Sequence, residues 1–524
     1  MTQQKSENRI VPQGPRKLAP TRGVERHGGG KAIPVTGENQ QFMLPFATAE
    51  NPPTSGAEGA NPSDPSVEKA HKVPKANVNQ NPTGSARMEE VVDRLYGAFD
   101  KVAANKGAPG PDGQTIDDVR ERLDWIVYDL RRSLLDGSYT PGDIRRVWIP
   151  KGGGKMRGLG IPNVVDRMVQ EAVRQVLEPL YEPTFHPSSH GFRPGRGCQT
   201  AIRQAASYVE EGRHWLVDLD LEKFFDKVHH QRLTARLAER VGDRRVLVLI
   251  GKMLKAGVVM PDGVKVATEE GVPQGGPLSP LLSNIVLDEL DWELARRGHR
   301  FVRYADDCNI YVRSERAGER VMASVVDFID RRLRLKVNEA KSAVARPETR
   351  HFLGYRLAPT PDGPPEILLS ERSAKRLQAR IRELTPRSSG VSMEARIHEI
   401  NVYLRGWLGH FRICTRGIEQ VVGAADARLR RRLRASQLKQ WKRKRTIAKR
   451  LIKLGINSKT AWRTVYDGRK SIWALSHTWA VDRALNNAHF ATLGLFPLKT
   501  AFSRIWASHS ATEQLSLLPL TERS

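Results

Sequence analysis

The sequence predicts an α+β fold that is preceded by a disordered extension and followed by an all-helical region. Two short apolar runs, residues 301–302 and 310–312, flank a turn and predict a β-hairpin. Apolar residues spaced as on one helical face follow later, at Ile397, Ile400, Leu404 and Leu408. Residues 1–84 are rich in Pro, Gly, Asn, Gln and Ser, a composition that buries too little apolar surface to fold.

Ordered structure is expected to begin near Met88. Apolar residues recur there at helical spacing, at Val91, Val92, Leu95, Phe99 and Val102. Glycine and proline turns at residues 107–113 end this segment, and a second helix is expected over residues 116–135.

Composition points to a polyanionic partner. The 524 residues carry a formal charge of +27, so binding to nucleic acid is the default expectation, with affinity that falls as salt rises. No apolar run approaches the roughly 20 residues that span a bilayer, and no signal peptide opens the chain, which predicts a cytoplasmic protein without a membrane partner. The three cysteines are far apart, which argues against disulfides and structural zinc.

Carboxylates mark the expected site. Asp306 and Asp307 lie in the predicted hairpin turn, where metal or water must offset their repulsion. An Asp-Asp pair alone is more often a solvated turn, so a third carboxylate is needed. Asp220 is the candidate, because it follows an apolar, strand-like run at residues 216–219. Two or three carboxylates with substrate phosphates make a two-ion magnesium site.

The motifs resemble those of reverse transcriptases. Asp-x-x-x-x-Phe-Asp at residues 220–226 is followed by Gly-Val-Pro-Gln-Gly-Gly-Pro-Leu-Ser-Pro at residues 271–280 and Tyr-Ala-Asp-Asp at residues 304–307. Further stretches resemble, more narrowly, the reverse transcriptase/maturase encoded in bacterial group II introns, in the form that lacks an endonuclease domain. They are residues 105–113, 149–162, 191–196, 352–355, 403–407 and 487–490.

The resemblance covers roughly residues 88–498 and implies a right-hand polymerase. Fingers and a palm with a small antiparallel sheet are expected over residues 85–370, a helical thumb and maturase domain over residues 371–498, and a short tail over residues 499–524. We expect no endonuclease domain.

The same resemblance assigns the site. Asp220, Asp306 and Asp307 are the expected catalytic residues, and two Mg²⁺ ions are expected on Asp220, Asp306 and the backbone carbonyl of Leu221. Phe225 is expected to exclude the 2′ hydroxyl of ribonucleotides, although a plain core role is the alternative. The expected contacts to deoxynucleoside triphosphates are Lys151, Arg157, Leu221, Phe225, Gln274 and Lys341.

A basic segment predicts RNA contacts. Residues 428–450 contain many Lys and Arg and no acidic residue, whereas a solvated helix normally mixes signs. The expected RNA-binding residues are Arg193, Arg196, Arg431, Arg432, Arg434, Lys442, Arg443, Lys444 and Arg445. Trp441 and Trp462 are expected either to stack on bases or to pack in the helical core.

The function implied is an RNA-directed DNA polymerase that binds its parent group II intron RNA, assists its splicing and copies it into cDNA. Its partners would be that intron RNA, an RNA template with a DNA primer or target, and deoxynucleotides. The alternatives are a domesticated relative serving phage defence, CRISPR spacer acquisition or sequence diversification, and a splicing-only RNA-binding maturase. The oligomeric state stays open.

Overall fold

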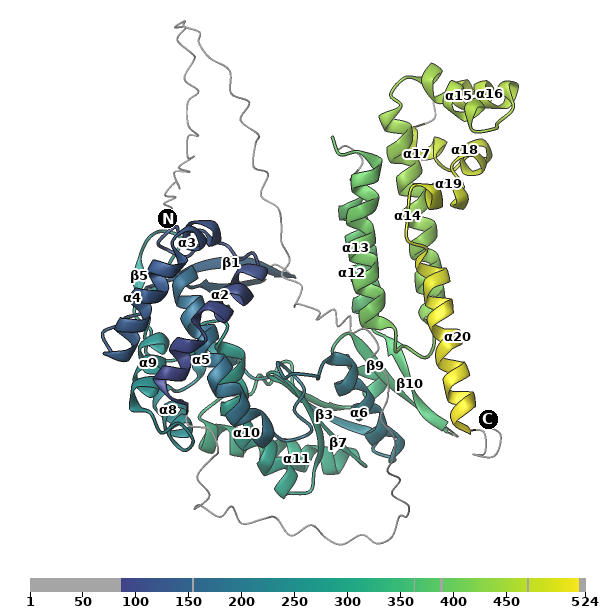
Figure 1. The fold of residues 1–524 in the computed structure, drawn as a ribbon. Coiled ribbons are helices and arrows are strands. Elements are labelled where there is room, and N and C mark those ends of the chain that lie inside the picture. Colours follow the sequence, from purple (N-terminus) through teal and green to yellow (C-terminus); the bar gives the residue numbers. More distant parts are fainter. Residues whose placement is uncertain (1–85, 153–154, 362, 387–389, 469–470, 518–524) are drawn as a thin grey trace, which may run out of the picture. The chain divides into compact units, whose positions relative to one another are not determined.

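The computed structural model describes residues 86–152, 155–361, 363–386, 390–468 and 471–517 (Figure 1). The predicted disordered extension, residues 1–84, lies outside this range. The described chain is an α+β structure, as predicted. Within these ranges, none of the helices combines the length and the apolar character needed to cross a lipid bilayer.

The two N-terminal helices predicted from the sequence are each interrupted once. The first becomes α1 (Met88–Asp93) and α2 (Leu95–Ala104), and the second becomes α3 (Ile116–Glu121) and α4 (Leu123–Leu135). The second break lies at Arg122, whose backbone leaves the helical region at φ −119° and ψ 21°. The periodic apolar residues are nevertheless buried, because each pair of helices presents one common face to the core.

A four-stranded sheet follows, with strand order β2-β1-β4-β5. β1 (Ile144–Gly152) and β2 (Lys155–Ile161) form an antiparallel hairpin, and the short strands β4 (Val258–Val259) and β5 (Lys265–Val266) extend it. The outer edge of β2 meets the loop at Gln274, where the Gly160 amide donates to the Gln274 carbonyl at 2.7 Å. This contact joins the sheet to the loop that carries a predicted site residue.

The central sheet has the order β6-β7-β3-β8, with every neighbouring pair antiparallel. Its strands are β3 (Trp215–Leu219), β6 (Arg300–Tyr304), β7 (Asp307–Val312) and β8 (Ala343–Ala345). Strand alternation divides its side chains between two cores. Val217 and Ile310 belong to the first core, whereas Leu216, Val302 and Tyr311 belong to the second.

Helices account for most of the rest of this region. Those that precede the central hairpin in the chain are α5 (Val164–Tyr181), α6 (Cys198–Glu210), α7 (Phe224–Lys227), α8 (His230–Ala238), α9 (Arg244–Leu254) and α10 (Ser279–Arg296). α11 (Glu315–Phe328) follows it and continues into a π-helical turn at Ile329–Leu333. α10 has Leu278 as its N-cap, and the Ser279 hydroxyl donates to the Pro273 carbonyl at 2.6 Å.

The C-terminal part begins with the hairpin of β9 (Tyr355–Thr360) and β10 (Gly363–Leu369) and is helical thereafter. Its longer helices are α12 (Glu371–Leu384), α13 (Met393–Phe411), α14 (Ile418–Gln440), α15 (Lys444–Lys453) and α16 (Ser458–Tyr466). Three short helices follow, α17 (Ile472–Leu475), α18 (Trp479–Ala484) and α19 (Asn487–Thr492).

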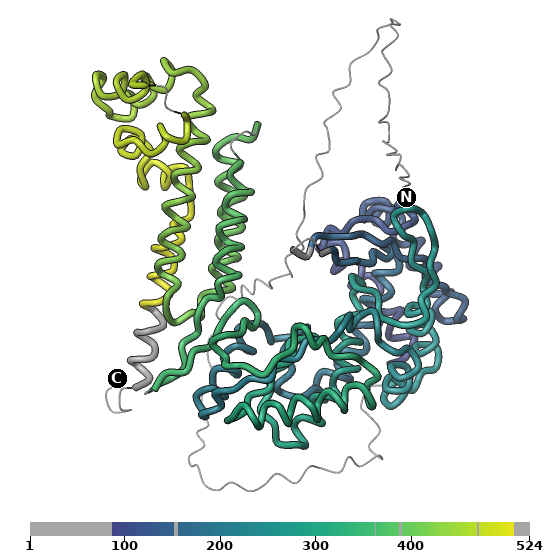
Figure 2. Tube along the Cα trace, turned by 180° about the vertical axis from the view of Figure 1, so that it is seen from behind, coloured from purple at the N-terminus to yellow at the C-terminus, as the bar shows by residue number. Residues whose placement is uncertain are grey.

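Two predicted boundaries need correction. Residues 499–517 are not a tail, because α20 (Leu498–Leu517) covers them and packs beside α14 (Figures 1 and 2). Leu498 and Phe502 are buried in the second core, which anchors the start of this helix. The boundary at residue 370 does not separate two cores either, since α6, β9 and β10 share the second core with the C-terminal helices.

Candidate active site

The predicted hairpin is present, and its turn carries the predicted carboxylates. Tyr304 pairs with Asp307, so Ala305 and Asp306 form a two-residue turn. Ala305 has a φ of 57°, in the left-handed region that two-residue hairpin turns require. Asp306 therefore stands at the tip, and Asp307 begins the returning strand.

The register of β3 against β7 brings the third carboxylate to the same place. Asp218 pairs with Asn309, and Leu219 pairs with Cys308. Continuing this register by one residue sets Asp220 opposite Asp307. Since side chains alternate along a strand, Asp218, Asp220 and Asp307 share one face of the sheet. The side chain of Asp218 therefore points toward the other carboxylates.

Negative charge is crowded at this end of the sheet. Desolvation raises the pKa of Asp307 to about 7, and the charges of Asp306, Asp220 and Asp218 add to the rise, whereas Lys341 opposes it. Burial also raises the pKa of Asp218, although Arg350 opposes this shift through an ion pair of 2.5 Å. A site with this charge distribution favours a bound cation.

Lys341 is the cation next to Asp220. Its ammonium group donates to the two carboxylate oxygens of Asp220 at 2.7 and 2.9 Å. The Asp220 amide donates to the hydroxyl of Ser342 at 3.0 Å, and Arg350 donates to the Lys341 carbonyl at 2.5 Å. Lys341 and Asp220 lie 121 positions apart in the chain, and the structure brings them together.

The donor chemistry suits magnesium, which prefers oxygen ligands. Among the residues that the structure describes, however, no group of three His, Cys, Asp or Glu side chains is arranged to hold a metal ion already. Lys341 neutralises Asp220 in this arrangement. The residues therefore fit the ion by their chemistry and by their shared face, and Lys341 would have to yield Asp220 to it.

The orientation of the Leu221 backbone follows from its pairing with Val337. Leu221 forms an isolated antiparallel bridge with Val337, and its neighbours make the hydrogen bonds of this bridge: Glu222 donates to Lys336, and Asn338 donates to Asp220, both at 2.8 Å. In such a pair, the amide and carbonyl of the bridging residue point away from the partner segment. The Leu221 carbonyl therefore faces the side on which β7 lies, while its side chain is buried.

Two predicted nucleotide contacts lie together although they are 117 residues apart. Arg157 in β2 donates from Nε to Oε1 of Gln274 at 2.9 Å, and its side chain is exposed. The glycine loop between β1 and β2 lies outside the described residues. For Lys151 only the backbone position, near the end of β1, is defined.

The position of Phe225 is compatible with both of its predicted roles, exclusion of a 2′ hydroxyl and packing in the core. It is in α7, 8% exposed, and its ring packs edge-on against Phe224 at a centroid distance of 5.3 Å. Its carbonyl accepts from the Val272 amide at 2.6 Å. Gly271 has a φ of 94°, and a Cβ atom there would lie 2.9 Å from the Phe225 carbonyl oxygen. The loop that carries Gln274 is thus held tightly against α7.

Arg193 lies inside the protein. It was expected to touch RNA, but it is buried and pairs with Glu182 at 2.8 Å. Its guanidinium also donates to the carbonyls of His186 and Ser189, and so it organises the loop before α6. Arg196 is partly exposed and donates to the Pro187 carbonyl at 2.5 Å.

The basic segment divides into an internal and an external half. Arg434 is buried and pairs with Asp482, Arg432 donates to the Thr385 carbonyl at 2.6 Å, and Arg431 stacks on Trp473 at 4.2 Å. These three contacts are within the protein, and RNA binding by these arginines stays a prediction. The consecutive residues Lys442, Arg443, Lys444 and Arg445 are exposed as expected. Trp441 is buried and Trp462 half-buried, which favours the packing interpretation.

Arg303 was not singled out in the sequence. It is fully buried beneath the hairpin turn and forms an ion pair with Asp291 of α10. The signal was available, because Arg303 stands inside an apolar strand directly before Tyr-Ala-Asp-Asp. A charge in such a position is rare without a partner.

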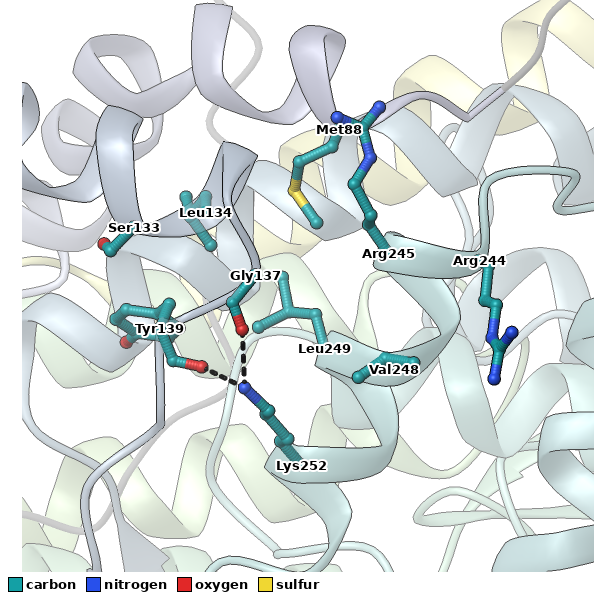
Figure 3. Close-up of a pocket in the computed structure, with 10 residues that line it drawn as sticks. All are labelled: Met88, Ser133, Leu134, Gly137, Tyr139, Arg244, Arg245, Val248, Leu249 and Lys252. Atoms are coloured by element: carbon teal, nitrogen blue, oxygen red, sulfur yellow. Dashed lines mark hydrogen bonds between the residues drawn. The ribbon is translucent and has the colours of Figure 1, made fainter.

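A separate pocket of about 210 Å³ lies between the start of α1, the end of α4 and α9 (Figure 3). Lys252 crosses it and donates to the carbonyls of Gly137 and Tyr139 at 2.9 and 2.7 Å. Its lining contains neither a carboxylate nor any predicted site residue. The charged end of the central sheet, rather than this pocket, is the candidate active site.

Comparisons with known proteins point to one family. The family described as reverse transcriptase (RNA-dependent DNA polymerase) matches residues 149–357, and the group II intron maturase-specific domain matches residues 374–454. Protein YkfC of Escherichia coli is 36% identical over 48% of this chain and 77% of its own length. The group II intron-encoded protein LtrA of Lactococcus lactis is 38% identical, over 38% of this chain and 33% of its own.

Other likenesses are more distant. The putative COX1/OXI3 intron 2 protein of Saccharomyces cerevisiae is 29% identical over 56% of this chain and 41% of its own. Among solved structures, a chain of a partial Cas6-RT-Cas1–Cas2 complex covers 46% of this chain and 43% of its own, at 24% identity and a TM-score of 0.30. That score is too low to support an argument.

Fold and site together define a reverse transcriptase, an RNA-directed DNA polymerase. The chain belongs to the group II intron reverse transcriptase/maturase family. The match to LtrA spans only about a third of LtrA's own length.

Proposed function

We propose that this reverse transcriptase copies its parent group II intron RNA into cDNA by two-metal nucleotidyl transfer, and that it also binds that RNA and assists its splicing. The observation that carries the polymerase part is the convergence of Asp220, Asp307 and the Asp306 turn on one end of the central sheet. The maturase-specific match at residues 374–454 supports the splicing part.

The chain's own residues have distinct tasks in this proposal. Asp220, Asp306 and the Leu221 carbonyl would hold magnesium, which when bound acidifies the primer hydroxyl and offsets charge on the triphosphate. Asp307 adds negative charge beside them. Lys341 keeps Asp220 neutralised in the substrate-free protein and is close enough to turn toward a phosphate once Asp220 is engaged elsewhere.

Substrate orientation would come from the β2 edge and the adjoining loop. Arg157 is held by Gln274 and remains exposed, so its other guanidinium donors can reach a triphosphate. Lys151 is proposed to assist from β1. Phe225 is proposed to lie under the deoxyribose of the incoming nucleotide and to exclude a 2′ hydroxyl by its bulk.

Asp306→Asn tests the polymerase proposal. The substitution keeps the size of the side chain and removes its charge, so we expect loss of DNA synthesis on primed RNA with intron RNA affinity unchanged. Asp330→Asn is the matched control, because Asp330 is exposed in the π-helical turn after α11, and it should retain synthesis. Synthesis by the Asp306→Asn protein at the unmodified rate would refute the proposed site.

Comparing Asp306→Asn with the unmodified protein also separates DNA synthesis from splicing. An intron splicing assay with purified RNA should give equal rates for Asp306→Asn and the unmodified protein, because the carboxylates are not needed to hold RNA. If unmodified protein splices intron RNA but makes no cDNA, the splicing-only alternative holds. If it makes cDNA and leaves splicing unchanged, the domesticated alternative holds.

A further inference from the structure

We propose that Arg303 is a positioning residue for the reaction: its buried guanidinium fixes the turn that carries Asp306. This inference rests on the proposed function of the carboxylates. The identity of the catalytic residues does not determine how the turn is held in place.

The hydrogen bonds of Arg303 form a complete set. An arginine side chain has five N–H donors, and here each has an acceptor. Nε and one terminal nitrogen donate to the two carboxylate oxygens of Asp291 at 2.7 and 2.5 Å. The same terminal nitrogen donates to the Ser189 hydroxyl at 2.7 Å. The other donates to Oδ1 of Asn284 at 3.0 Å and to the Ala305 carbonyl at 2.9 Å.

The bond to the Ala305 carbonyl acts directly on the catalytic turn. The peptide group is planar, so holding this oxygen also fixes the amide nitrogen of Asp306 and the direction in which its Cα leaves. Ala305 itself has a left-handed backbone, which is costly for a residue with a side chain. The surrounding structure must therefore hold the turn in place, and Arg303 supplies one such contact.

Gly191 closes the turn from another direction. A Cβ atom at Gly191 would lie 2.2 Å from the Ala305 amide nitrogen, so only glycine allows this approach. Asn284 joins the two supports, because it donates to the Gly191 carbonyl at 2.9 Å and accepts from Arg303. The segment before Gly191 is also tied to β6, where the His190 amide donates to the Arg303 carbonyl at 2.8 Å.

Stability alone is a poor explanation for this network. Arg303 and Asp291 are both fully buried, and buried ion pairs are often no more stabilising than apolar residues of similar volume. An apolar side chain, however, could not hold these parts of the chain together by directional hydrogen bonds. The network joins β6, α10, the segment at Ser189 and the turn at Ala305.

Arg303→Lys is the principal test. Lysine keeps the positive charge beside Asp291 but lacks the planar fork that reaches the other acceptors. In single-turnover incorporation on primed RNA, we expect the maximal rate to fall roughly 10- to 100-fold, as a displaced reactive group can cause. Affinity for the primed RNA should be unchanged, because the network is buried away from the surface.

A second measurement does not depend on turnover. Fe²⁺ in place of Mg²⁺ cleaves the backbone near the ion it replaces, in the presence of ascorbate and peroxide. In the unmodified full chain, with primed RNA whose primer lacks a 3′ hydroxyl and with a deoxynucleoside triphosphate bound, we expect cleavage near residues 220 and 306, and Arg303→Lys should weaken the cut at residue 306 more than that at residue 220. Thermal unfolding, followed in parallel, gives the folded fraction by which each rate is corrected.

Arg396→Lys is the matched control. Arg396 is also a buried arginine, in α13, where it donates to the Ser436 hydroxyl at 2.6 Å. The same chemical change should lower its melting temperature but leave the incorporation rate per folded molecule unchanged. Equal rate losses in both arginine variants would mean that the effect is general destabilisation, and would overturn the proposal.

Asn284→Ala keeps the test decisive if Arg303→Lys does not fold. It removes one acceptor of Arg303 and the donor to Gly191 while leaving the ion pair intact. An incorporation rate within about twofold of the unmodified protein, in either variant that folds, would overturn the positioning role. Failure of the proposed function looks different, because then the unmodified and Asp306→Asn proteins would incorporate equally.

Discussion

At the scale of single residues, Asp218 and Asp220 differ in their ion-pair partners. Asp218 and Asp220 are both acidic and both lie on the carboxylate face, but their partners separate them. Arg350 pairs with Asp218 through a half-buried contact, whereas Lys341, half-exposed and flexible, pairs with Asp220. We therefore expect Asp220, rather than Asp218, to exchange its partner for an ion.

Phe225 and Phe224 give a matched pair for the sugar-exclusion proposal. Phe225→Val should raise ribonucleotide incorporation relative to deoxynucleotide incorporation, because the smaller side chain leaves room for a 2′ hydroxyl. Phe224→Val makes the same chemical change at a more buried neighbour and should lower stability without altering sugar choice. Competition between the two nucleotide types on primed RNA measures the effect, and equal selectivity in both variants would leave Phe225 as a core residue.

The residue-scale predictions from sequence succeeded where local pattern sets geometry. Tyr-Ala-Asp-Asp between two apolar runs specified a hairpin turn, and the structure has one. The internal position of Arg193 was not predictable, because the sequence does not show the Glu182 carboxylate or the His186 carbonyl that enclose it. For Arg303 the sequence shows a charge inside an apolar strand but not its partners, since most of its acceptors come from distant segments of the chain.

At the scale of elements, α14 and α15 distribute the basic segment differently. Along α14, helical periodicity turns Arg434 into the protein and leaves Arg431 stacked on Trp473. At the start of α15, the exposed run of residues 442–445 faces outward. The absence of acidic residues from residues 428–450 indicates excess positive charge. Composition does not reveal which of the arginines form contacts inside the protein.

This division predicts two different phenotypes. Replacing residues 442–445 by Gln should reduce the dependence of RNA affinity on salt, by roughly one unit in the log–log slope for each phosphate that is no longer neutralised. Arg434→Gln should instead lower the melting temperature, because it leaves Asp482 and the Leu485 carbonyl without their partner. Filter binding across a salt series, together with thermal unfolding, distinguishes them; an unchanged slope in the first variant would exclude these residues as phosphate ligands.

At the scale of the whole molecule, the second core joins regions that the sequence appeared to separate. α6 contributes Ile202, Ala205 and Tyr208 to the same cluster as the C-terminal helices. Gln199 in α6 donates to the carbonyls of Gly409 and His410 at 2.7 and 3.1 Å. Sequence patterns identify individual helices, but they do not reveal which helices share a core.

α20 provides the stability test at this scale. Phe502 is 1% exposed, so Phe502→Ala should lower the free energy of unfolding by about 3 to 5 kcal/mol. Arg504→Ala, on the exposed side of the same helix, should change it little. Chemical denaturation measures both, and equal stability in the two variants would show that α20 does not belong to the core.

The shared core also limits how freely such proteins can recombine. A graft of residues 371–517 from one relative onto another would carry the C-terminal half of the apolar interface and leave its α6 and β-hairpin complement behind. Mismatched side chains would then meet across a surface that each parent keeps closely packed. Successful chimaeras should therefore exchange α6 and the β9–β10 hairpin together with the C-terminal helices.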